Sequence, residues 1–351
     1  MKMKWFPLLI ALAVVISLVV VGCAKPAPAE VITLKYADQN PEGGWAIEQA
    51  AKPWLTAMED ATGGRVKFEP YYGQTLCKGV DAWESVKSGV ADFAWCFHGY
   101  WAGTTPVSDV LSLPFLPFKS AEQGSGIFWQ LYEQYPSISE QYKDNHVMLT
   151  WMSSPYLLIN SKREVKTLDD FAGLKLRVTG GPPTEMMKLL GVSPMMVGMP
   201  DTYVNIQKGV IDGMLLPWEA VLTFRQYEVV KYYNYAPFYA VSFTQSMNLD
   251  TWNSLPPDIQ QQLESVCGLK GSMHWGKNMF DTAAAEAHKR IAAEGYEMIE
   301  YTPTAEQLAE WTELAGTPLW EEWVKNMEAA GHPEAQEIMD TTLGLIDTFN
   351  P

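Results

Sequence analysis

Hydrophobic and polar positions follow two different periods along the chain, and the changes of period mark the predicted elements. Residues 31–36, 66–71 and 91–97 are typical of strands, whereas residues 46–62 and 81–88 carry apolar side chains at helical spacing. Gly63 and Gly64 end the first of these helices. Because strands alternate with helices, the pattern predicts parallel βαβ units and an α/β fold.

The second half of the chain predicts connections between two lobes. The apolar stretches 147–159 and 240–249 are expected to be strands that cross from one lobe to the other, and residues 258–294 predict one helix of roughly 55 Å that spans both. Residues 304–330 and 333–349 predict further helices. A mature chain of roughly 330 residues also favours two lobes. We assign residues 31–152 and 243–280 to lobe I, and residues 153–242 and 281–351 to lobe II.

A faint internal repeat supports two lobes of similar build. Residues 81–92 and 201–212 share the frame Asp-x-aromatic-x-x-aliphatic-x-x-Gly-Val-x-Asp without a gap. The frame describes a capped short helix, a glycine that ends it, and the start of a strand. The alternative is a chance match between two ordinary helix-to-strand turns.

The N-terminus predicts export. Lys2 and Lys4 precede an almost unbroken apolar run through Val21, as in a secretory signal peptide, although a run of this length can also be a transmembrane anchor. Residues 20–23 (VVGC) resemble the lipobox of bacterial lipoproteins. This resemblance implies a signal peptide over residues 1–22, a lipid on Cys23 and a tether over residues 23–30. The protein would then be exported and anchored by lipid at the outer face of the cytoplasmic membrane or in the periplasm.

Charge and cysteine content narrow the possible partners. The net charge is −16 and no basic run is present, so nucleic acid is not an expected partner. An anion site on so acidic a protein needs a locally positive pocket. Cys77 and Cys96 either form a disulfide, which export permits, or remain reduced and buried. No cysteine or histidine spacing matches a zinc site, and no cofactor is expected.

Arg177 is the strongest candidate for the side chain that would give an anion site its local positive charge. It lies near the end of a predicted strand, residues 174–178, where ligands bind in open α/β sheets. A helix is predicted to begin after Gly181, and its free N–H groups would also attract an anion. Because a guanidinium donates two parallel hydrogen bonds, it suits a carboxylate. The alternative is a surface salt bridge to a nearby acid.

Four segments carry a resemblance to a known family: residues 168–178 (LDDFAGLKLRV), 209–213 (GVIDG), 89–92 (GVAD) and 247–256 (MNLDTWNSLP). They resemble the substrate-binding proteins of tripartite ATP-independent periplasmic (TRAP) transporters, the DctP-like family. The resemblance implies a two-lobed periplasmic binding protein fold, type II-like, that closes on its ligand. It also implies that Arg177 pairs with the carboxylate of a small organic acid, and that TRAP membrane subunits receive the ligand.

Two departures from the family pattern point to a monocarboxylate. Members that bind sialic acid or dicarboxylates often carry a second Arg where this chain has Tyr156, and Glu-Asn where it has Leu215 and Leu216. A second buried carboxylate would therefore lack a partner, at a cost of several kcal/mol. We expect a ligand with an apolar or aromatic body. The expected lining, whose members could instead be core residues, is Leu215, Leu216, Trp218, Trp95, Phe97 and Trp101.

Two interpretations remain for each of two further residues, His98 and Glu219. His98 follows a predicted strand end and either contacts the ligand or caps a turn. Some 2-oxo-acid members of the family hold the ligand through a cation near a Trp and a Glu, which makes Glu219, after Trp218, a candidate metal ligand. The alternative is a solvated Glu at the start of a helix.

Other classes of function remain in competition with transport. An exported enzyme is disfavoured because the chain has no Gly-x-Ser-x-Gly, His-Glu-x-x-His or Gly-x-Gly-x-x-Gly motif. A ligand sensor for a membrane receptor would use the same fold and stays open.

Overall fold

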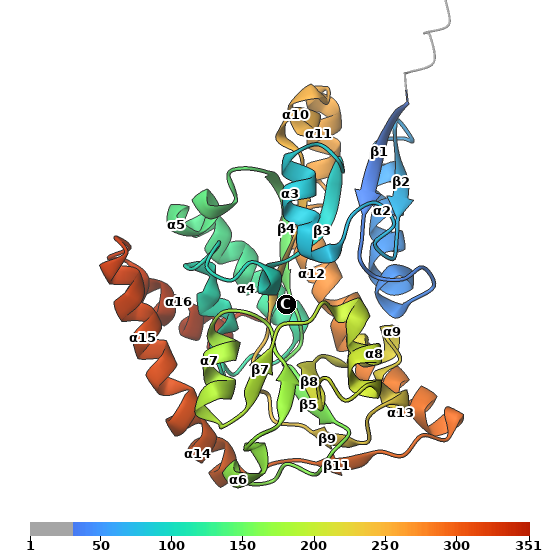
Figure 1. Ribbon diagram of the computed structural model, residues 1–351. Coiled ribbons are helices and arrows are strands. Elements are labelled where there is room, and N and C mark those ends of the chain that lie inside the picture. The colour runs from blue at the N-terminus through green and yellow to red at the C-terminus, as the bar shows by residue number, and fades with distance from the viewer. Residues whose placement is uncertain (1–30) are drawn as a thin grey trace, which may run out of the picture.

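The structure is a computed structural model and describes residues 31–351. The predicted signal peptide, Cys23 and the tether lie outside these residues. Two separate sheets form the centres of two lobes, one above the other in Figure 1. No helix within residues 31–351 is both long enough and apolar enough to cross a membrane.

The sheet of the first lobe has five strands in the order β2-β1-β3-β10-β4. Strands β1, β2 and β3 run parallel, and β10 is antiparallel to both of its neighbours. The strands are β1 (Ile32–Ala37), β2 (Val66–Tyr71), β3 (Phe93–Phe97), β4 (His146–Met152) and β10 (Ser242–Met247). The helices of this half are η2 (Ile47–Ala51), α2 (Lys52–Ala61), η3 (Gly79–Asp81), α3 (Ala82–Lys87), η4 (His98–Tyr100), η5 (Ser108–Ser112), α4 (Ala121–Gln134), α5 (Pro136–Ser139), η6 (Glu140–Tyr142), α10 (Leu249–Ser254), α11 (Pro257–Glu264) and α12 (Gly268–Trp275).

The sheet of the second lobe has six strands in the order β11-β9-β5-β8-β6-β7. Strand β6 is parallel to both β7 and β8. The strands are β5 (Leu157–Asn160), β6 (Lys175–Arg177), β7 (Ser193–Met195), β8 (Gly213–Leu216), β9 (Tyr232–Asn234) and β11 (Ile299–Tyr301). The remaining helices are α6 (Leu168–Phe171), α7 (Pro182–Leu189), η7 (Met199–Asp201), α8 (Thr202–Gln207), α9 (Trp218–Thr223), η8 (Gln226–Glu228), η9 (Gly276–Asp281), α13 (Ala283–Glu294), α14 (Ala305–Ala315), α15 (Thr317–Ala329) and α16 (Ala335–Thr348).

The internal repeat is a real structural repeat. In the first lobe Asp92 accepts a hydrogen bond from the backbone N–H of Lys35 at 2.7 Å, which ties α3 and β3 to β1. In the second lobe Asp212 accepts from the backbone N–H of Lys175 at 2.9 Å, which ties α8 and β8 to β6. Gly89 and Gly209, which end the two helices, have φ of +76° and +69°. The β1–β3 and β6–β8 units are therefore built alike.

Three predicted elements are interrupted. The stretch 147–159 forms β4 and β5, separated by residues 153–156. The helix expected over residues 258–294 is broken after α11, because Cys267 is extended and Gly268 has a φ of +56°. From Gly268 onward α12, the π-helical η9 and α13 follow one another almost without a break. The helix of residues 304–330 divides into α14 and α15 at Gly316.

The helical segments α12, η9 and α13 still connect the two lobes. Segment α12 packs on α4 and β4 of the first lobe, whereas α13 packs on α9 of the second. Segment η9 lies between them, at the level where the lobes meet (Figure 1). The last helix, α16, packs on α4 and η5. It therefore accompanies the first lobe, although we expected all of residues 281–351 to belong to the second.

Aromatic packing fixes the inner face of the first sheet. Trp151 of β4 stacks on Phe243 of β10 with ring centroids 5.0 Å apart, and Trp275 of α12 lies 4.8 Å from Trp151. All three side chains are buried. Such pairs stabilise a core beyond the area they bury and hold β10, which carries one wall of the site, in a fixed position.

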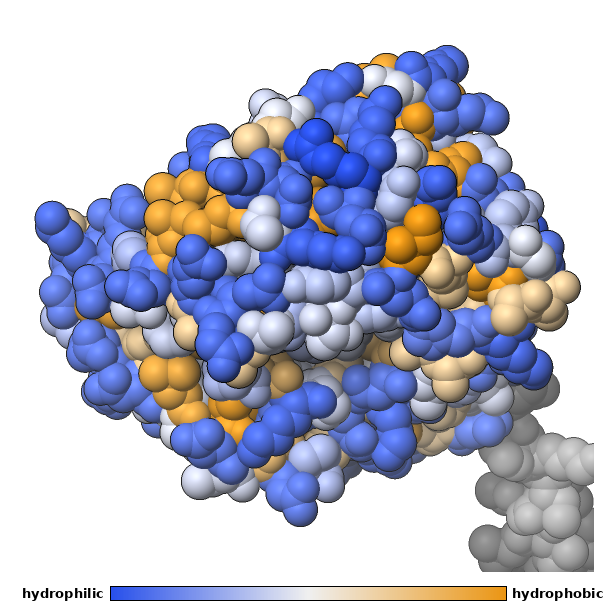
Figure 2. Space-filling view, turned by 90° about the horizontal axis from the view of Figure 1, so that it is seen from below, coloured by the Kyte–Doolittle hydropathy of each residue, from blue (hydrophilic) through white to orange (hydrophobic). Residues whose placement is uncertain are grey.

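The surface is mostly hydrophilic. On the face of Figure 2, seen from below, apolar residues occupy separate areas among hydrophilic ones. The sequence carries 41 acidic against 25 basic residues, so the positive charge needed by an anion site has to be local.

Candidate functional site

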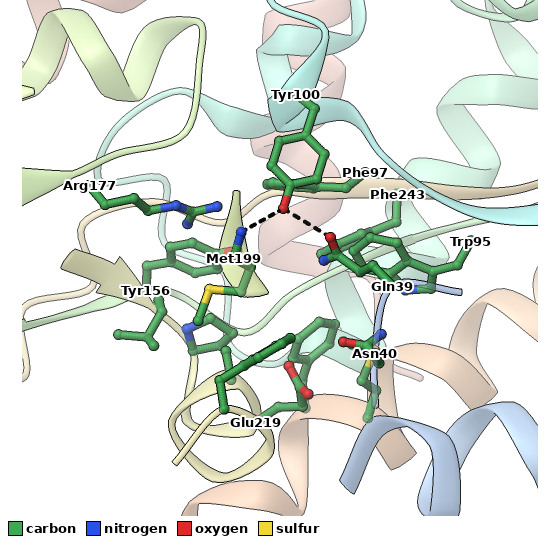
Figure 3. A pocket seen from close by; sticks show the side chains of 16 residues that line it. Gln39, Asn40, Trp95, Phe97, Tyr100, Tyr156, Arg177, Met199, Glu219 and Phe243 are labelled. Atoms are coloured by element: carbon green, nitrogen blue, oxygen red, sulfur yellow. Dashed lines mark hydrogen bonds between the residues drawn. The ribbon is translucent and has the colours of Figure 1, made fainter. Parts of the chain in front are cut away.

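A cleft opens between the two lobes, at the carboxyl ends of the parallel strands. It holds about 360 Å³ of space outside the protein atoms, part of which is open to solvent. Such a space suits a small molecule held tightly. The lining residues are Gln39, Asn40, Trp95, Phe97, Tyr100, Tyr156, Arg177, Met199, Leu216, Pro217, Glu219, Ala220, Phe224, Phe243, Met279 and Phe280 (Figure 3).

The repeat explains why these residues meet. Gln39 and Asn40 follow β1, and Trp95 and Phe97 lie in β3, whereas Arg177 ends β6 and Leu216 ends β8. Each lobe thus directs the ends of its two equivalent parallel strands toward the other lobe. In open α/β sheets this edge is where ligands bind.

Arg177 is buried in the wall of this cleft, with 2% of its surface exposed. Its Nε donates to the carbonyl oxygen of Val197 at 3.1 Å. Within residues 31–351 no carboxylate lies within 4.0 Å of its side-chain nitrogens, so the surface salt bridge considered above is not formed. A buried guanidinium without a counter-charge is costly, and an incoming carboxylate would supply one.

Aromatic rings cover much of the remaining wall. The Phe97 and Phe243 rings are stacked with centroids 5.1 Å apart, and Trp95 lies 5.1 Å from Phe243. Tyr156 also faces the cleft, where burial raises the pKa of its hydroxyl and the positive charge of Arg177 acts in the opposite direction. The indole Nε1 of Trp95 is buried without a hydrogen-bond partner in the described part of the chain. The cleft thus has an apolar body with few polar groups.

Two hydrogen bonds join the lobes beside the cleft. The Tyr100 hydroxyl donates to Gln39 Oε1 at 3.0 Å and accepts from the backbone N–H of Met199, across the cleft, at 3.0 Å (Figure 3). The N–H of Gly180 donates to the carbonyl oxygen of Gly99 at 3.0 Å. A Cβ on Gly180 would lie 2.7 Å from the Cβ of Ala102, so only glycine permits this approach. We call these two contacts the clasp.

Glu219 is a buried acid in the cleft and not the solvated residue considered above. It is 3% exposed, and its Oε1 accepts from Thr223 Oγ1 at 2.5 Å. Burial raises the pKa of Glu219 to about 8, the Thr223 hydrogen bond opposes this shift, and the neighbouring Asp38 adds to it. No group of three or more His, Cys, Asp or Glu side chains able to hold a metal occurs within residues 31–351.

Five predicted site residues lie elsewhere. His98 is buried, its Nδ1 is 2.9 Å from Ser242 Oγ, and burial lowers its pKa to about 3. Trp101 packs on Trp83 and His98, and Trp218 stacks on Tyr233. Leu215 is part of the core. These four pack against other side chains, and their sequence neighbours Phe97, Tyr100, Leu216 and Glu219 line the cleft instead.

Gly181 is the fifth of these residues. Helix α7 begins after it as predicted, but the helix N-terminus does not line the cleft. The group beside Gly181 is the carboxylate of Asp109, whose Oδ2 lies 3.5 Å from where a Cβ of Gly181 would stand. Burial raises the pKa of Asp109 to about 7.

Cys77 and Cys96 are free thiols, so the disulfide allowed by export is not formed in the structure. Cys96 lies inside β3, where it is opposite Thr244 of β10 and fully buried, and Cys77 is half-buried in the loop before η3. Burial raises the pKa of both thiols, which keeps them protonated and unreactive.

Sequence reasoning missed several lining residues, among them Gln39, Asn40, Tyr100, Phe243 and Phe280. A signal for the first two existed, because they directly follow the strand that is equivalent to that of Arg177. Phe243 and Phe280 come from the return strand and from the π-helical segment η9, and no local pattern distinguishes them from core residues. Segments of π-helix are often found at functional sites.

Two lobes closed on a cleft with a buried cation define an extracytoplasmic solute-binding protein. The family described as "Bacterial extracellular solute-binding protein, family 7" (DctP) matches residues 39–326, and the chain belongs to this family. Its members bind small organic acids, work with TRAP membrane subunits and are not enzymes. This confirms the predicted fold class, the predicted family and the prediction that the protein is exported.

Two solved structures and one curated relative resemble most of the chain. A TRAP solute-binding protein of Rhodoferax ferrireducens in complex with copurified benzoate is 26% identical, with 90% of this chain and 98% of that chain covered and a TM-score of 0.84. A marine metagenome TRAP protein specific for aromatic acid ligands, with 3-hydroxybenzoate, is 25% identical over 92% and 100%, with a TM-score of 0.85. The C4-dicarboxylate-binding periplasmic protein DctP of Rhodobacter capsulatus is 25% identical over 87% of this chain and 90% of its own length.

Proposed function

We propose that this protein binds a small monocarboxylate with an aromatic or apolar body, holds its carboxylate with Arg177, and delivers it to TRAP membrane subunits. The observation that carries the proposal is the buried Arg177 guanidinium, which faces an aromatic cleft without a carboxylate partner in residues 31–351. A guanidinium stays protonated in proteins, so a bound carboxylate would neutralise it.

The charges in the cleft favour one carboxylate over two. Arg177 and Glu219 are the only ionisable lining residues apart from the two tyrosines among those described. Because burial raises the pKa of Glu219 to about 8, this side chain is mostly neutral at pH 7 and the cleft carries one net positive charge. A second carboxylate would find Tyr156 and Leu216 rather than a cation. The relatives include a dicarboxylate-binding protein, so this proposal is based on the cleft and not on similarity.

The mechanism that we propose is closure. The ligand carboxylate meets Arg177 of the second lobe, and the Trp95, Phe97 and Phe243 rings of the first lobe then cover its body. Binding shifts the balance toward the closed form only as far as the closed form binds more tightly. The clasp at Tyr100 and Gly180 would stabilise the closed form that the membrane subunits recognise.

The test is calorimetric titration of the purified protein with benzoate, phenylacetate and succinate. We expect benzoate or phenylacetate to bind at least tenfold more tightly than succinate, and Arg177→Ala to weaken this binding by tenfold or more, because a charge-assisted pair is worth about 1.5–3 kcal/mol.

Arg290→Ala is the matched control, since Arg290 pairs with Glu286 on the surface of α13 and does not line the cleft. It should bind as the wild type does. Unchanged binding in Arg177→Ala would remove Arg177 from the site. Tight binding of succinate alone would overturn the monocarboxylate assignment.

We also propose that Cys23 carries a lipid that anchors the protein outside the cytoplasm, on the strength of the VVGC sequence at residues 20–23. The expected result is a mature chain that begins at a diacylglyceryl-modified Cys23 and fractionates with membranes, whereas Cys23→Ala should not be lipidated. Mass spectrometry of the N-terminal peptide decides this, and an unmodified Cys23 in the mature wild type would refute the anchor.

A further inference from the structure

The cleft has polar groups at two separate places, and the proposed function uses only one of them. Arg177, from β6, lies on one side of the cleft, whereas Gln39, Asn40 and Glu219 line other parts of its wall (Figure 3). Gln39 and Asn40 follow β1 of the first lobe, and Glu219 lies in the first turn of α9 of the second. No salt bridge joins Glu219 to a Lys, Arg or His within residues 31–351. We call Gln39, Asn40 and Glu219 the distal group.

Each member of the distal group keeps an unused hydrogen-bonding atom. Glu219 Oε1 accepts from Thr223, and Oε2 has no partner in the described chain. Gln39 uses Oε1 to accept from Tyr100 and leaves its amide Nε2 free. Asn40 donates through Nδ2 to Asp38 Oδ1 at 2.8 Å, which fixes the orientation of its amide and leaves its Oδ1 available as an acceptor. The distal group therefore offers both donors and acceptors on the wall of a largely apolar cleft.

A hydroxyl group matches this set better than a second carboxylate does. A hydroxyl donates once and accepts twice, so it can donate to Asn40 Oδ1 and accept from Gln39 Nε2 and from the neutral carboxyl group of Glu219. A second carboxylate only accepts, so it would leave Asn40 Oδ1 without a donor, and no cation among the described lining residues other than Arg177 would offset the cost of burying its charge. Leaving the distal group against an unsubstituted ring would bury its free atoms without partners, which is costly.

We propose that the distal group is a subsite for a hydroxyl group, and that Glu219 makes the protein select hydroxylated aromatic monocarboxylates over unsubstituted ones. This inference rests on the proposed function, since it requires the ligand carboxylate to lie at Arg177. It names the ligand class more narrowly and assigns a specificity-determining role to Glu219, Gln39 and Asn40.

The test compares benzoate with 2-, 3- and 4-hydroxybenzoate by calorimetric titration at pH 7. We expect the wild type to bind at least one hydroxybenzoate tenfold or more tightly than benzoate. Glu219→Leu should reduce that ratio to below threefold, and Glu219→Gln should keep most of the ratio because an amide still donates and accepts.

Two controls keep the test decisive. Glu185→Gln alters an exposed acid that pairs with Lys188 on α7 outside the cleft, and it should change neither affinity. The matching methoxybenzoate needs no variant: it cannot donate, so the wild type should bind it at least tenfold more weakly than the preferred hydroxybenzoate. This comparison stands even if Glu219→Leu fails to fold.

The outcomes separate this inference from the proposed function. If benzoate binds in an Arg177-dependent manner but no hydroxyl improves its affinity, the hydroxyl subsite is wrong and the monocarboxylate site stands. The same holds if the preference survives in Glu219→Leu. If no monocarboxylate binds the wild type, the proposed function itself fails.

Discussion

At the scale of single residues, Tyr100 connects the two lobes through its hydroxyl group. Its hydroxyl contacts Gln39 and Met199 from opposite lobes. Tyr100→Phe keeps the ring against Phe97, 4.7 Å away, and removes both hydrogen bonds. The Met199 N–H then lacks a partner in the closed form, so we expect benzoate affinity to fall by about 5- to 30-fold.

Calorimetric titration measures this effect, and Tyr203→Phe is the matched control. The Tyr203 hydroxyl donates to Glu228 on the surface and lies away from the cleft. A change of less than twofold in Tyr100→Phe would mean that the clasp does not stabilise the ligand-bound form.

The same scale shows how far the sequence could locate the site. Arg177, Tyr156, Leu216, Trp95 and Phe97 were predicted to face the ligand, and all five line the cleft. Each lies at or near the end of a strand, or at a position marked by the family pattern. His98, Trp101 and Trp218 also follow strand ends, but their rings turn into aromatic clusters of the core. Which way a ring turns depends on packing partners distant in sequence, and no local pattern encodes that.

At the scale of elements, the repeat carried more information than its weak sequence match suggested. The frame at residues 81–92 and 201–212 marks α3–β3 and α8–β8, and in both copies the final Asp binds the backbone of the neighbouring parallel strand. Together with β1 and β6, these strands and the residues that follow β1 supply Gln39, Asn40, Trp95, Phe97, Arg177 and Leu216 to the cleft. The gapless repeat was interpreted as a sign of two lobes of similar build, and in the structure the strands that it marks end at the cleft between those lobes.

The helix predicted over residues 258–294 is an element for which the sequence pattern was misleading. Apolar periodicity continues through residues 258–294, and it predicted one helix. The break at Gly268 depends on a φ of +56°, a conformation that glycine permits but does not require. The π-helical η9 places Met279 and Phe280 on the cleft wall. An extra residue per turn leaves no mark in the hydrophobic pattern, so this contribution could be found only in the structure.

At the scale of the whole molecule, buried acids link stability to pH. Burial raises the pKa of Glu219 to about 8, and of Asp38 and Asp109 to about 7. The folded protein therefore holds protons that the unfolded chain releases, and each acid stabilises the fold less as the pH rises toward its folded pKa. His98 and His146 act in the opposite direction, since burial lowers their pKa to about 3 and about 4, but their effect is complete once the pH exceeds about 6.5.

Above pH 6.5 these buried acids should determine how the melting temperature changes with pH. We expect the melting temperature of the ligand-free protein to fall by several degrees between pH 6.5 and 8.5, with Glu219 alone contributing about 2 kcal/mol over this interval. Glu219→Gln should reduce the fall because an amide does not titrate, while Glu185→Gln, at an exposed site, should leave it unchanged. Differential scanning calorimetry at half-unit steps measures this dependence. A melting temperature that stays constant over the interval would show that these acids are already ionised in the folded protein, and the cleft would then lack the net positive charge that favours a monocarboxylate.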